Sequence, residues 1–560
     1  MNRLAASAFV LLAPSLSPAQ RPAAPAPSSP RLVVLVSVDQ LAAWVYAQAA
    51  PHFAGDGGFR RLEQHGVQFL QCAYQHACSE TGPGHATIST GAPAAAHGIV
   101  RNQWYSVDDK KVVYCVGHEQ AALDDLPEGK DRGPDRLLAP TLGDSVKAHI
   151  PGSKVLSVSW KDRSAILMGG RAADAAVWCE NSTGRFVTNS FWCEKTPPWL
   201  ADFNASKVVD SYFGWVWDRF AGADAYAGLV DDRPYEFVHG NGSKQRTLPQ
   251  PMTGGKEQPS SAYYTELYAS PVGNELVRLC AEAGVRGMQL GEDAVPDLLC
   301  VSFSSTDLMG HYFGPDSVEA RDGLLRLDRT LGRFLQFLDG AVGAGRYALF
   351  LTADHGVGPT PEWARANGVD AGRGALSTMA RAAAEAALRQ RYGALPSGQH
   401  YLTHVGEYSM FLSHEVLAAQ APDAPLAQVV LEASRVAAAA AAGTKGIAAA
   451  YATADLMAPG AQDDAIRTAI RAALHPDRAG DVQLVVKPYW LDGTLPASHG
   501  TPHAYDREVV AFAYGGGAPQ GLRLTRPITP GFGAVWLALQ LGVPRPSLAV
   551  DTVPEELLPR

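Results

Sequence analysis

The sequence predicts an α/β fold: a mostly parallel central sheet flanked by helices, with inserted cap or lid segments. Two observations lead to this prediction. Continuous apolar, β-branched runs recur at residues 32–38, 298–303 and 347–352, which is typical of strands buried on both faces of a parallel sheet. Segments such as 316–338 carry apolar residues at helical spacing with charged outer positions, which is typical of helices that cover such a sheet.

The other elements follow from the same patterns. We expect further strands at 67–74, 154–159, 482–486 and 509–514, and helices at 59–66, 380–392, 427–442 and 533–541. The segment 172–295 is rich in Trp, Gly, Pro and Asn, and we expect loops and small hairpins over the main sheet. The Ala-rich segment 364–480 is expected to be a helical insertion, a lid or side lobe.

The N-terminus has the features of an export signal. A positive start, Met1-Asn2-Arg3, precedes a short apolar run, and small residues follow before Gln20. We expect a signal peptide at 1–19, a Pro/Ala-rich linker at 20–30 and one main domain from 31 to 560 with the two insertions. The alternative is an apolar N-terminal tail without a targeting role. Export predicts a periplasmic or secreted protein.

Composition excludes several classes of partner. The chain has 560 residues, 46% hydrophobic and 18% charged, with a net charge of −9 and no basic run. Nucleic acid and anionic membranes are therefore not expected as partners. No segment after the signal has 18 consecutive apolar residues, so stable membrane insertion is not expected.

Seven cysteines raise the question of disulfide bonds. In an exported protein some are expected to pair. Cys179 and Cys193 are close in the sequence, as are Cys72 and Cys78, and the odd number leaves at least one thiol free. Spacing does not give the connectivity.

The stretch from Ser79 to Gly91 contains a hydroxyl residue in an unusual setting. Gly82, Pro83 and Gly84 predict a tight turn after Thr81, and the small residues that follow suit the first turns of a helix. The positive end of a helix dipole favours anions. A threonine hydroxyl becomes a nucleophile only when a base or metal lowers its pKa. Taken alone, this stretch is also compatible with an ordinary capped turn.

Acids and histidines follow the predicted buried strands. Since the carboxyl ends of parallel strands share one edge of a sheet, where ligands bind, we expect these residues to meet. Three carboxylates with three imidazoles suit two borderline metal ions, zinc first. The predicted ligands are Asp39, Asp307, His311, Asp354, His355 and His499.

Three further residues could hold a phosphate group. Lys161 and Arg163 lie two apart after the 154–159 run, so in extended chain they share a face. The planar guanidinium of Arg163 and the compact ammonium charge of Lys161 together suit a dianionic phosphate group. Asn102 could donate an amide hydrogen bond to an oxyanion. The alternatives are two solvated charges and a turn asparagine.

Together these motifs resemble the alkaline phosphatase superfamily, and within it the type I phosphodiesterase/nucleotide pyrophosphatase-like group. Asn102 and Lys161-x-Arg163 resemble the phosphate-irrepressible bacterial alkaline phosphatases of the PafA type. The motifs are Thr-Gly-Pro-Gly-His-Ala-Thr from Thr81, Thr-Asp-Leu-Met-Gly-His around Asp307, Thr-Ala-Asp-His-Gly around Asp354 and Ser-His-Gly around His499.

The resemblance implies a role for each site residue. Asp307, His311 and His499 would hold one zinc ion, and Asp39, Asp354 and His355 the other. Thr81 would be the nucleophile, bridging toward the second zinc, while Asn102, Lys161 and Arg163 would hold the non-bridging oxygens. His503 is a second candidate in the last motif, but the family places its ligand at the His before Gly, so the assignment goes to His499 and His503 would support the site or be structural. Glu80 is expected to point away from phosphate.

The function implied is hydrolysis of small phosphate monoesters through a phospho-threonine intermediate, by a monomeric two-zinc enzyme. The alternative on the same fold is a phosphodiesterase or nucleotide pyrophosphatase. A hypothesis of another class is a catalytically dead phosphate- or metal-binding protein.

Overall fold

The computed structural model describes residues 29–119, 122–237, 246–406, 408–459 and 464–558. The expected signal peptide and all of the linker except its last two residues lie outside the described residues.

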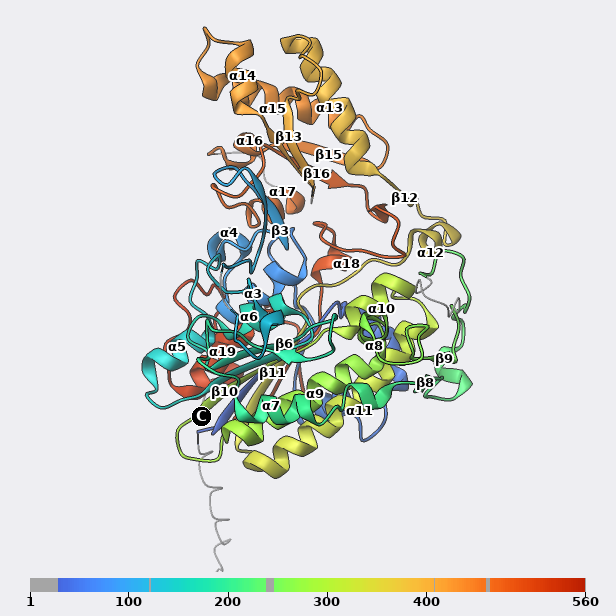
Figure 1. The fold of residues 1–560 in the computed structure, drawn as a ribbon, viewed down its shortest axis with the longest axis vertical. Helices are drawn as coiled ribbons and strands as arrows, with labels where there is room; N and C mark the ends of the chain where they lie inside the picture. The colour runs from blue at the N-terminus through green and yellow to red at the C-terminus, as the bar shows by residue number, and fades with distance from the viewer. Residues whose placement is uncertain (1–28, 120–121, 238–245, 407, 460–463, 559–560) are drawn as a thin grey trace, which may run out of the picture.

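Within the described residues, nine strands form the central sheet (Figure 1). β1 lies in the middle and pairs in parallel with β10 and β11. Among these strands, only β18 and β7 run against the others. The three apolar runs are thus confirmed as neighbouring, fully buried strands. In spatial order the sheet consists of β19 (Leu522–Leu524), β2 (Gly66–Phe69), β18 (Ala511–Gly515), β11 (Tyr347–Thr352), β1 (Leu32–Val38), β10 (Asp297–Phe303), β5 (Val155–Ser159), β6 (Ala175–Cys179) and β7 (Phe186–Val187).

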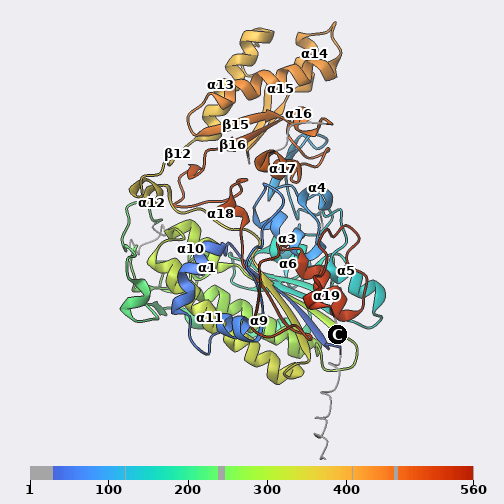
Figure 2. The ribbon, with the colours of Figure 1, turned by 180° about the vertical axis from the view of Figure 1, so that it is seen from behind.

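Helices cover both faces of this sheet (Figures 1 and 2). One layer contains α3 (Thr81–Thr90), α5 (Leu142–His149), α6 (Asp162–Gly169) and α19 (Phe532–Leu541). The other contains α1 (Ala43–Ala49), α2 (Gly58–His65), α7 (Pro198–Ala205), α8 (Ser261–Tyr268), α9 (Pro271–Met288), α10 (Ser305–Phe313) and α11 (Val318–Leu338). The expected helices at 59–66, 316–338 and 533–541 are confirmed, with bounds shifted by up to two residues.

The segment 172–295 differs from the expected loops. It contributes two strands to the main sheet, β6 and β7, and the long helix α9, which packs against β10 and β5. Short strands and helical turns cover the remainder, including the pair β8 (Val216–Trp217) and β9 (Gln250–Pro251).

The Ala-rich segment forms a lobe with its own hydrophobic core. It is not purely helical, because α13 (Leu376–Tyr392) and α15 (Leu426–Ala442) pack on an antiparallel sheet of four strands. The lobe sits at one end of the main domain (Figure 1). Its sheet runs in the order β13 (Leu402–Gly406), β14 (Ser409–Leu412), β16 (Val482–Val486) and β15 (Ile447–Ala452), and its other helices are α14 (His414–Gln420), α16 (Thr453–Met457) and α17 (Ala465–Arg471).

Short elements connect these parts. β12 pairs with β17 at the base of the lobe, and β3 pairs with β4 beside α3. Their bounds, with those of the remaining short helices, are β3 (Gln103–Ser106), β4 (Lys111–Tyr114), β12 (Gly372–Gly374), β17 (Trp490–Asp492), α4 (Ala94–His97), α12 (Pro361–Ala366) and α18 (Ala504–Arg507).

The disulfide expectation is wrong for this structure. All seven cysteines are free thiols, and six of them are buried. Cys179 lies in β6, whereas the Cys193 thiol is directed to the Asp174 carbonyl oxygen, 3.3 Å away. Proximity in the sequence therefore did not translate into pairing.

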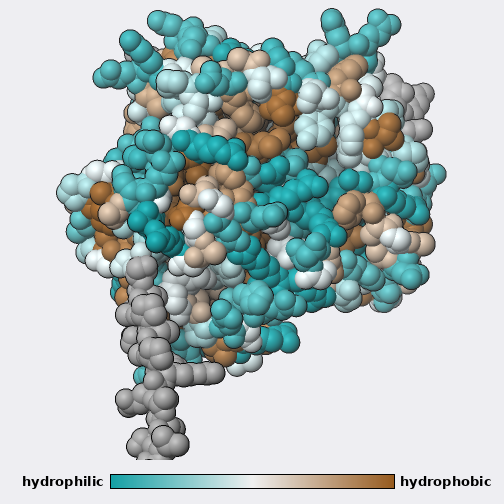
Figure 3. Space-filling model, turned by 90° about the horizontal axis from the view of Figure 1, so that it is seen from below, coloured by the Kyte–Doolittle hydropathy of each residue, from teal (hydrophilic) through white to brown (hydrophobic). Residues whose placement is uncertain are grey.

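The surface is predominantly hydrophilic at the end of the molecule away from the lobe, where hydrophobic residues form only small areas (Figure 3). None of the helices in the described ranges combines the length and the apolar character that crossing a bilayer demands.

Candidate active site

The predicted charged residues meet at the carboxyl edge of the central sheet. Asp39 directly follows β1, Asp354 follows β11 by two residues, and Lys161 follows β5 by two. Asp307 lies in the first turn of α10, which begins after β10. These strands are parallel neighbours, so their ends converge, and all four side chains are buried.

Thr81 is the first residue of α3. The tight turn expected at Gly82-Pro83-Gly84 is wrong, because these residues form the first helical turn. Gly84 has a different reason to be glycine: a Cβ there would lie 2.0 Å from the Asp354 carbonyl oxygen. The missing side chain lets α3 approach β11 closely and brings Thr81 to the Asp354 loop.

Two cations converge on the Thr81 hydroxyl. The Lys161 Nζ lies 3.1 Å from Thr81 Oγ1, and the Arg163 Nη2 lies 3.3 Å from it. They reach it differently from the extended arrangement expected, because β5 ends at Ser159 and Arg163 lies in the first turn of α6. The convergence was predicted correctly, but the local backbone was not.

Asn102 lies at the amino end of α3. Its Oδ1 accepts a hydrogen bond from the Gly82 N–H at 2.7 Å. This contact fixes the orientation of the side chain and leaves the amide NH₂ as its donor group. Glu80 does not face the Thr81 hydroxyl; its carboxylate accepts hydrogen bonds from Arg101 and from the Asn102 N–H.

The acids and histidines form two overlapping groups with spacing suited to a metal ion. One contains Asp307, His311 and His499, and the other Asp39, Asp307 and His355; in each group the possible ligand atoms lie within 4.8 Å of one another. The remaining predicted ligand, Asp354, is adjacent, with Oδ2 3.4 Å from the His355 Nε2. The structure thus brings all six predicted ligands together.

The three imidazoles share one orientation pattern. Each directs Nδ1 to a backbone carbonyl: His311 to Ala497 at 2.9 Å, His355 to Gly356 at 3.0 Å and His499 to Ser79 at 2.7 Å. An Nδ1–H that donates to a carbonyl leaves the Nε2 lone pair available, the arrangement found in metal-binding histidines. All three Nε2 atoms lie within 4.0 Å of the Asp307 Oδ1.

Several of these atoms have no hydrogen-bond partner although they are buried. They are both carboxylate oxygens of Asp39, the Asp354 Oδ2 and the His355 Nε2. Lys161 lies 2.7 Å from Asp39 and 2.6 Å from Asp307, so it offsets one of three carboxylate charges. Buried carboxylates without partners are costly. The residues present therefore fit bound cations.

The ionisation of the site follows from this crowding. Burial opposes the charge of His355, but the Asp354, Asp39 and Asp307 carboxylates outweigh it and raise the pKa of His355 to about 9. Burial and the neighbouring His355 lower the pKa of His499. Burial also opposes the charge of Lys161, yet Asp307 and Asp39 raise its pKa above the ordinary value. Lys161 therefore remains charged.

Sequence reasoning missed two residues that orient the site. Gln40 has a left-handed backbone (φ 66°), and its Nε2 donates to the Asp307 Oδ1 at 2.6 Å. His85 lies 3.2 Å from Asp354 and 2.8 Å from the Ser302 hydroxyl. Both adjoin predicted residues or motifs, which is the only signal the sequence offers. His503, which bonds the Val486 carbonyl, is not among the ligand groups.

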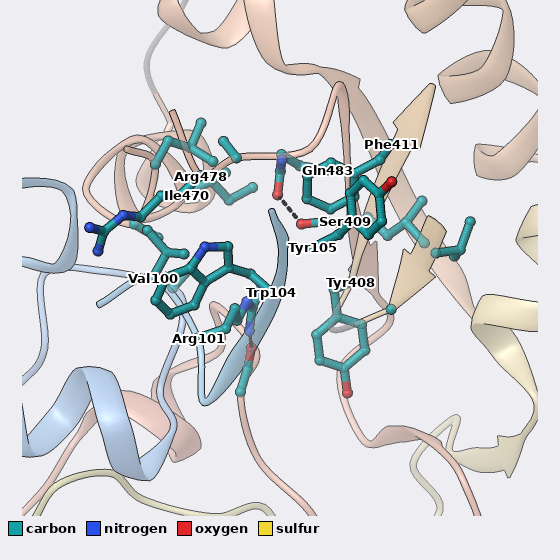
Figure 4. A pocket seen from close by; sticks show the side chains of 18 of the residues that line it. Val100, Arg101, Trp104, Tyr105, Tyr408, Ser409, Phe411, Ile470, Arg478 and Gln483 are labelled. Atoms are coloured by element: carbon teal, nitrogen blue, oxygen red, sulfur yellow. Dashed lines mark hydrogen bonds between the residues drawn. The ribbon is translucent and has the colours of Figure 1, made fainter. Parts of the chain in front are cut away.

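A cavity of about 290 Å³ opens between the lobe and the main domain (Figure 4). It adjoins the site through Arg101, the neighbour of Asn102, and Gly500, the neighbour of His499. Aromatic side chains from both parts line it, among them Trp104, Tyr408 and Phe411. The cavity therefore lies next to the site, at the junction with the lobe.

This fold and site define a class of protein. Residues 33–494 match the family model of type I phosphodiesterase / nucleotide pyrophosphatase, and the chain belongs to that family.

The chain is also similar to individual proteins that carry a more specific name than the family. Alkaline phosphatase PhoV of Synechococcus elongatus is 36% identical over 341 residues, 60% of each chain. Alkaline phosphatase PafA of Elizabethkingia meningoseptica is 31% identical over 393 residues, 70% of each chain. The match to PhoV spans less than two thirds of that protein. A crystal structure of PafA superimposes with a TM-score of 0.83 at 27% identity, covering 94% of this chain and 99% of PafA.

Proposed function

We propose that this protein is an exported, metal-dependent phosphomonoesterase, an alkaline phosphatase that hydrolyses small phosphate monoesters. The convergence of Lys161 and Arg163 on the Thr81 hydroxyl, beside the acid and histidine groups, carries the proposal. The alkaline phosphatase names of PhoV and PafA support it.

Two zinc ions are the cofactors that this donor set fits best, since zinc accepts mixed nitrogen and oxygen ligands without thiolate. Asp307, His311 and His499 would hold one, and Asp39, Asp354 and His355 the other, with Thr81 adjoining the second. Asp307 belongs to both acid–histidine groups. When bound, such ions lower the pKa of a coordinated hydroxyl and neutralise charge on the attacking and leaving oxygens.

The chain's own residues account for the remainder of the reaction. The Thr81 hydroxyl gives up its proton to solvent and Oγ1 attacks phosphorus; the bond to the alcohol oxygen breaks, and the alcohol leaves with a proton from solvent. Water then hydrolyses the phospho-threonine, which releases phosphate and regenerates the hydroxyl. Lys161, Arg163 and the Asn102 amide hold the non-bridging oxygens, and their fixed positions supply the electrostatic stabilisation.

Charge distinguishes the two activities considered for this fold. The group transferred from a monoester carries more negative charge than one from a diester, which has a second organic substituent. Two cations next to the nucleophile, the buried Lys161 and the half-buried Arg163, match the monoester. A phosphodiesterase would be better served by an apolar pocket at that place.

The test compares kcat/KM for p-nitrophenyl phosphate and bis-p-nitrophenyl phosphate in the wild type and in Lys161→Ala/Arg163→Ala. We expect a strong monoester preference, and a loss of at least about 100-fold in the variant that falls mainly on the monoester. Lys147→Ala, which removes a partly exposed lysine paired with Asp174, serves as control. Diester preference with an indifferent double variant would make the protein a phosphodiesterase. No turnover of either ester by the zinc-loaded wild type would support a binding protein.

A further inference from the structure

The Arg163 guanidinium reaches the Thr81 hydroxyl without a carboxylate partner of its own. Its Nη2 lies 3.3 Å from the Thr81 Oγ1, and its Nη1 donates to the Tyr114 hydroxyl at 3.4 Å. The buried Nε has no hydrogen-bond partner, and no ion pair joins this guanidinium to an acid among the described residues. Most of its N–H groups are therefore available to a bound anion.

Tyr114 comes to this guanidinium on the hairpin that also carries Asn102. It is the last residue of β4, and β4 pairs with β3, which begins directly after Asn102. The Cys115 N–H donates to the Asn102 carbonyl at 2.9 Å, which closes the base of the hairpin. Two of the groups proposed to hold phosphate, the Asn102 amide and the Arg163 guanidinium, are thus linked through one piece of backbone.

Asp162 fixes the direction of the Tyr114 hydroxyl. Its Oδ1 accepts the Tyr114 O–H at 2.7 Å and the Arg163 backbone N–H at 2.6 Å. Burial and the Asp162 charge raise the pKa of Tyr114 well above its ordinary value, so the hydroxyl keeps its proton. A hydroxyl that donates its only proton to Asp162 presents its lone pairs to other donors, and the Arg163 Nη1 is the donor found there.

Arg132 balances the charge of Asp162. Its Nε donates to the Asp162 Oδ2 at 2.5 Å, and its guanidinium lies over the Tyr114 ring, 5.3 Å from the ring centroid. The Asn189 Nδ2 donates to the Arg132 carbonyl at 2.7 Å, which anchors the backbone at this position. A carboxylate beside an unpaired arginine readily forms an ion pair with it. Because Asp162 is already paired, it does not compete with a phosphate group for the Arg163 guanidinium.

The two cations beside Thr81 are held in different ways. Lys161 lies 2.7 Å from Asp39 and 2.6 Å from Asp307, so carboxylates offset its charge. Arg163 contacts a neutral hydroxyl, which orients the guanidinium without neutralising it. Its positive charge therefore remains for the phosphate group, and a position fixed in advance reduces the entropy cost of ordering a long side chain when substrate binds.

We propose that Tyr114, oriented by Asp162 and Arg132, positions the Arg163 guanidinium for the phosphate group of the substrate. All three act through Arg163 and are positioning residues. The inference rests on the proposed phosphatase function and deepens it, because it gives a role to the residue that stands between Lys161 and Arg163 in the sequence.

Steady-state kinetics with p-nitrophenyl phosphate, and inhibition by inorganic phosphate, test the proposal on the zinc-loaded protein. Tyr114→Phe removes the hydroxyl and keeps the ring beneath Arg132. We expect kcat/KM to fall about tenfold and phosphate to inhibit about tenfold more weakly. In an Arg163→Ala background the same change should cost less than about twofold, because the group that it positions is absent. Tyr264→Phe, which removes a hydroxyl bonded to Asp210 at 2.9 Å, is the control and should change neither quantity.

Arg132→Gln tests the counterion by a separate route. It leaves Asp162 unpaired, so the carboxylate can capture the Arg163 guanidinium, and we expect kcat/KM to fall at least about fivefold. Adding Asp162→Asn removes that charge but keeps an Oδ1 that accepts from Tyr114, so the double variant should regain most of the lost activity. Circular dichroism shows whether each variant is folded.

Two results would overturn the positioning role. One is unchanged kinetics in folded Tyr114→Phe, and the other is an equal loss from this change in the wild-type and Arg163→Ala backgrounds. No recovery in the Arg132→Gln/Asp162→Asn variant would refute the part assigned to the counterion. In each of these cases the wild type still hydrolyses p-nitrophenyl phosphate and Arg163→Ala impairs it, so the proposed function stands. A wild type without turnover would refute the proposed function, and this inference with it.

Discussion

The carboxylate of Glu80 holds the backbone of Asn102, with Oε2 2.8 Å from the Asn102 N–H. Its other oxygen bonds Arg101 at 2.7 Å, and the side chain is 4% exposed. Asn102 in turn accepts a hydrogen bond from Gly82, next to Thr81. Glu80 therefore positions Asn102 relative to Thr81, a role that its place beside Thr81 in the sequence does not reveal.

Glu80→Gln should weaken monoester hydrolysis through Asn102. A glutamine keeps the shape but replaces one charged acceptor by a donor, so we expect kcat/KM to fall about tenfold, or ~1.4 kcal/mol. In an Asn102→Ala background the same change should cost less than about threefold, because coupled residues are not additive. Steady-state kinetics on all four proteins measure the coupling.

Glu385→Gln is the control for this cycle. Glu385 is also largely buried and accepts backbone hydrogen bonds, but it lies in the lobe. Full additivity of Glu80→Gln and Asn102→Ala would show that Glu80 acts by some route other than Asn102.

Gly84→Ala should damage both stability and activity. The added Cβ would meet the Asp354 backbone carbonyl at 2.0 Å, so α3 must move away from β11, carrying Thr81 with it. We expect a loss of at least about 2 kcal/mol in the free energy of unfolding and a fall in kcat beyond that of the unfolded fraction. Denaturant melts and kinetics measure the two effects.

Gly55→Ala provides the matched comparison, because nothing lies within 4 Å of a Cβ at that position. If Gly84→Ala behaved like Gly55→Ala, the close approach of α3 to the Asp354 loop would not be required.

Removal of metal ions by a chelator should lower both the activity and the thermal stability of the protein. Removing cations leaves Asp39, Asp307 and Asp354 buried around a single lysine, so we expect activity to fall more than about 100-fold and the thermal midpoint to drop. Zinc should restore both. The same drop in midpoint is expected in Thr81→Ala, which keeps the six proposed ligands. Full activity after exhaustive dialysis against EDTA would contradict the metal-dependent mechanism.

The juxtaposition of the candidate site residues could be predicted because they lie at the ends of continuous apolar strands. Runs such as residues 347–352 are visible without any tertiary information, and the acids that follow them must share an edge once the strands are parallel. The local backbone conformation at Lys161 and Gly82 was harder to predict, because the start of a helix depends on capping contacts and on the segments packed next to it.

The lobe shows where the sequence pattern does not predict the secondary structure. β15 has the sequence Ile-Ala-Ala-Ala-Tyr-Ala, whose alanines favour helix, and only its pairing with β16 makes it a strand. The roles of Gln40 and Glu80 could not be predicted, because they depend on contacts with Asp307 and Asn102, which are distant in the sequence. Such contacts arise from tertiary packing, which one sequence without homologues does not disclose.

Thr81→Ala should abolish turnover and spare phosphate binding. The substitution removes the proposed nucleophile but leaves Lys161 and Arg163, which we propose to hold the non-bridging oxygens. We expect kcat/KM for p-nitrophenyl phosphate to fall more than about 10³-fold, while inorganic phosphate still binds within about tenfold of the wild-type affinity. Isothermal titration of the zinc-loaded proteins measures the binding. Lys161→Ala/Arg163→Ala should instead lose phosphate affinity as well as monoester turnover. If Thr81→Ala retained substantial turnover, water rather than threonine would be the attacking group and no phospho-threonine would form.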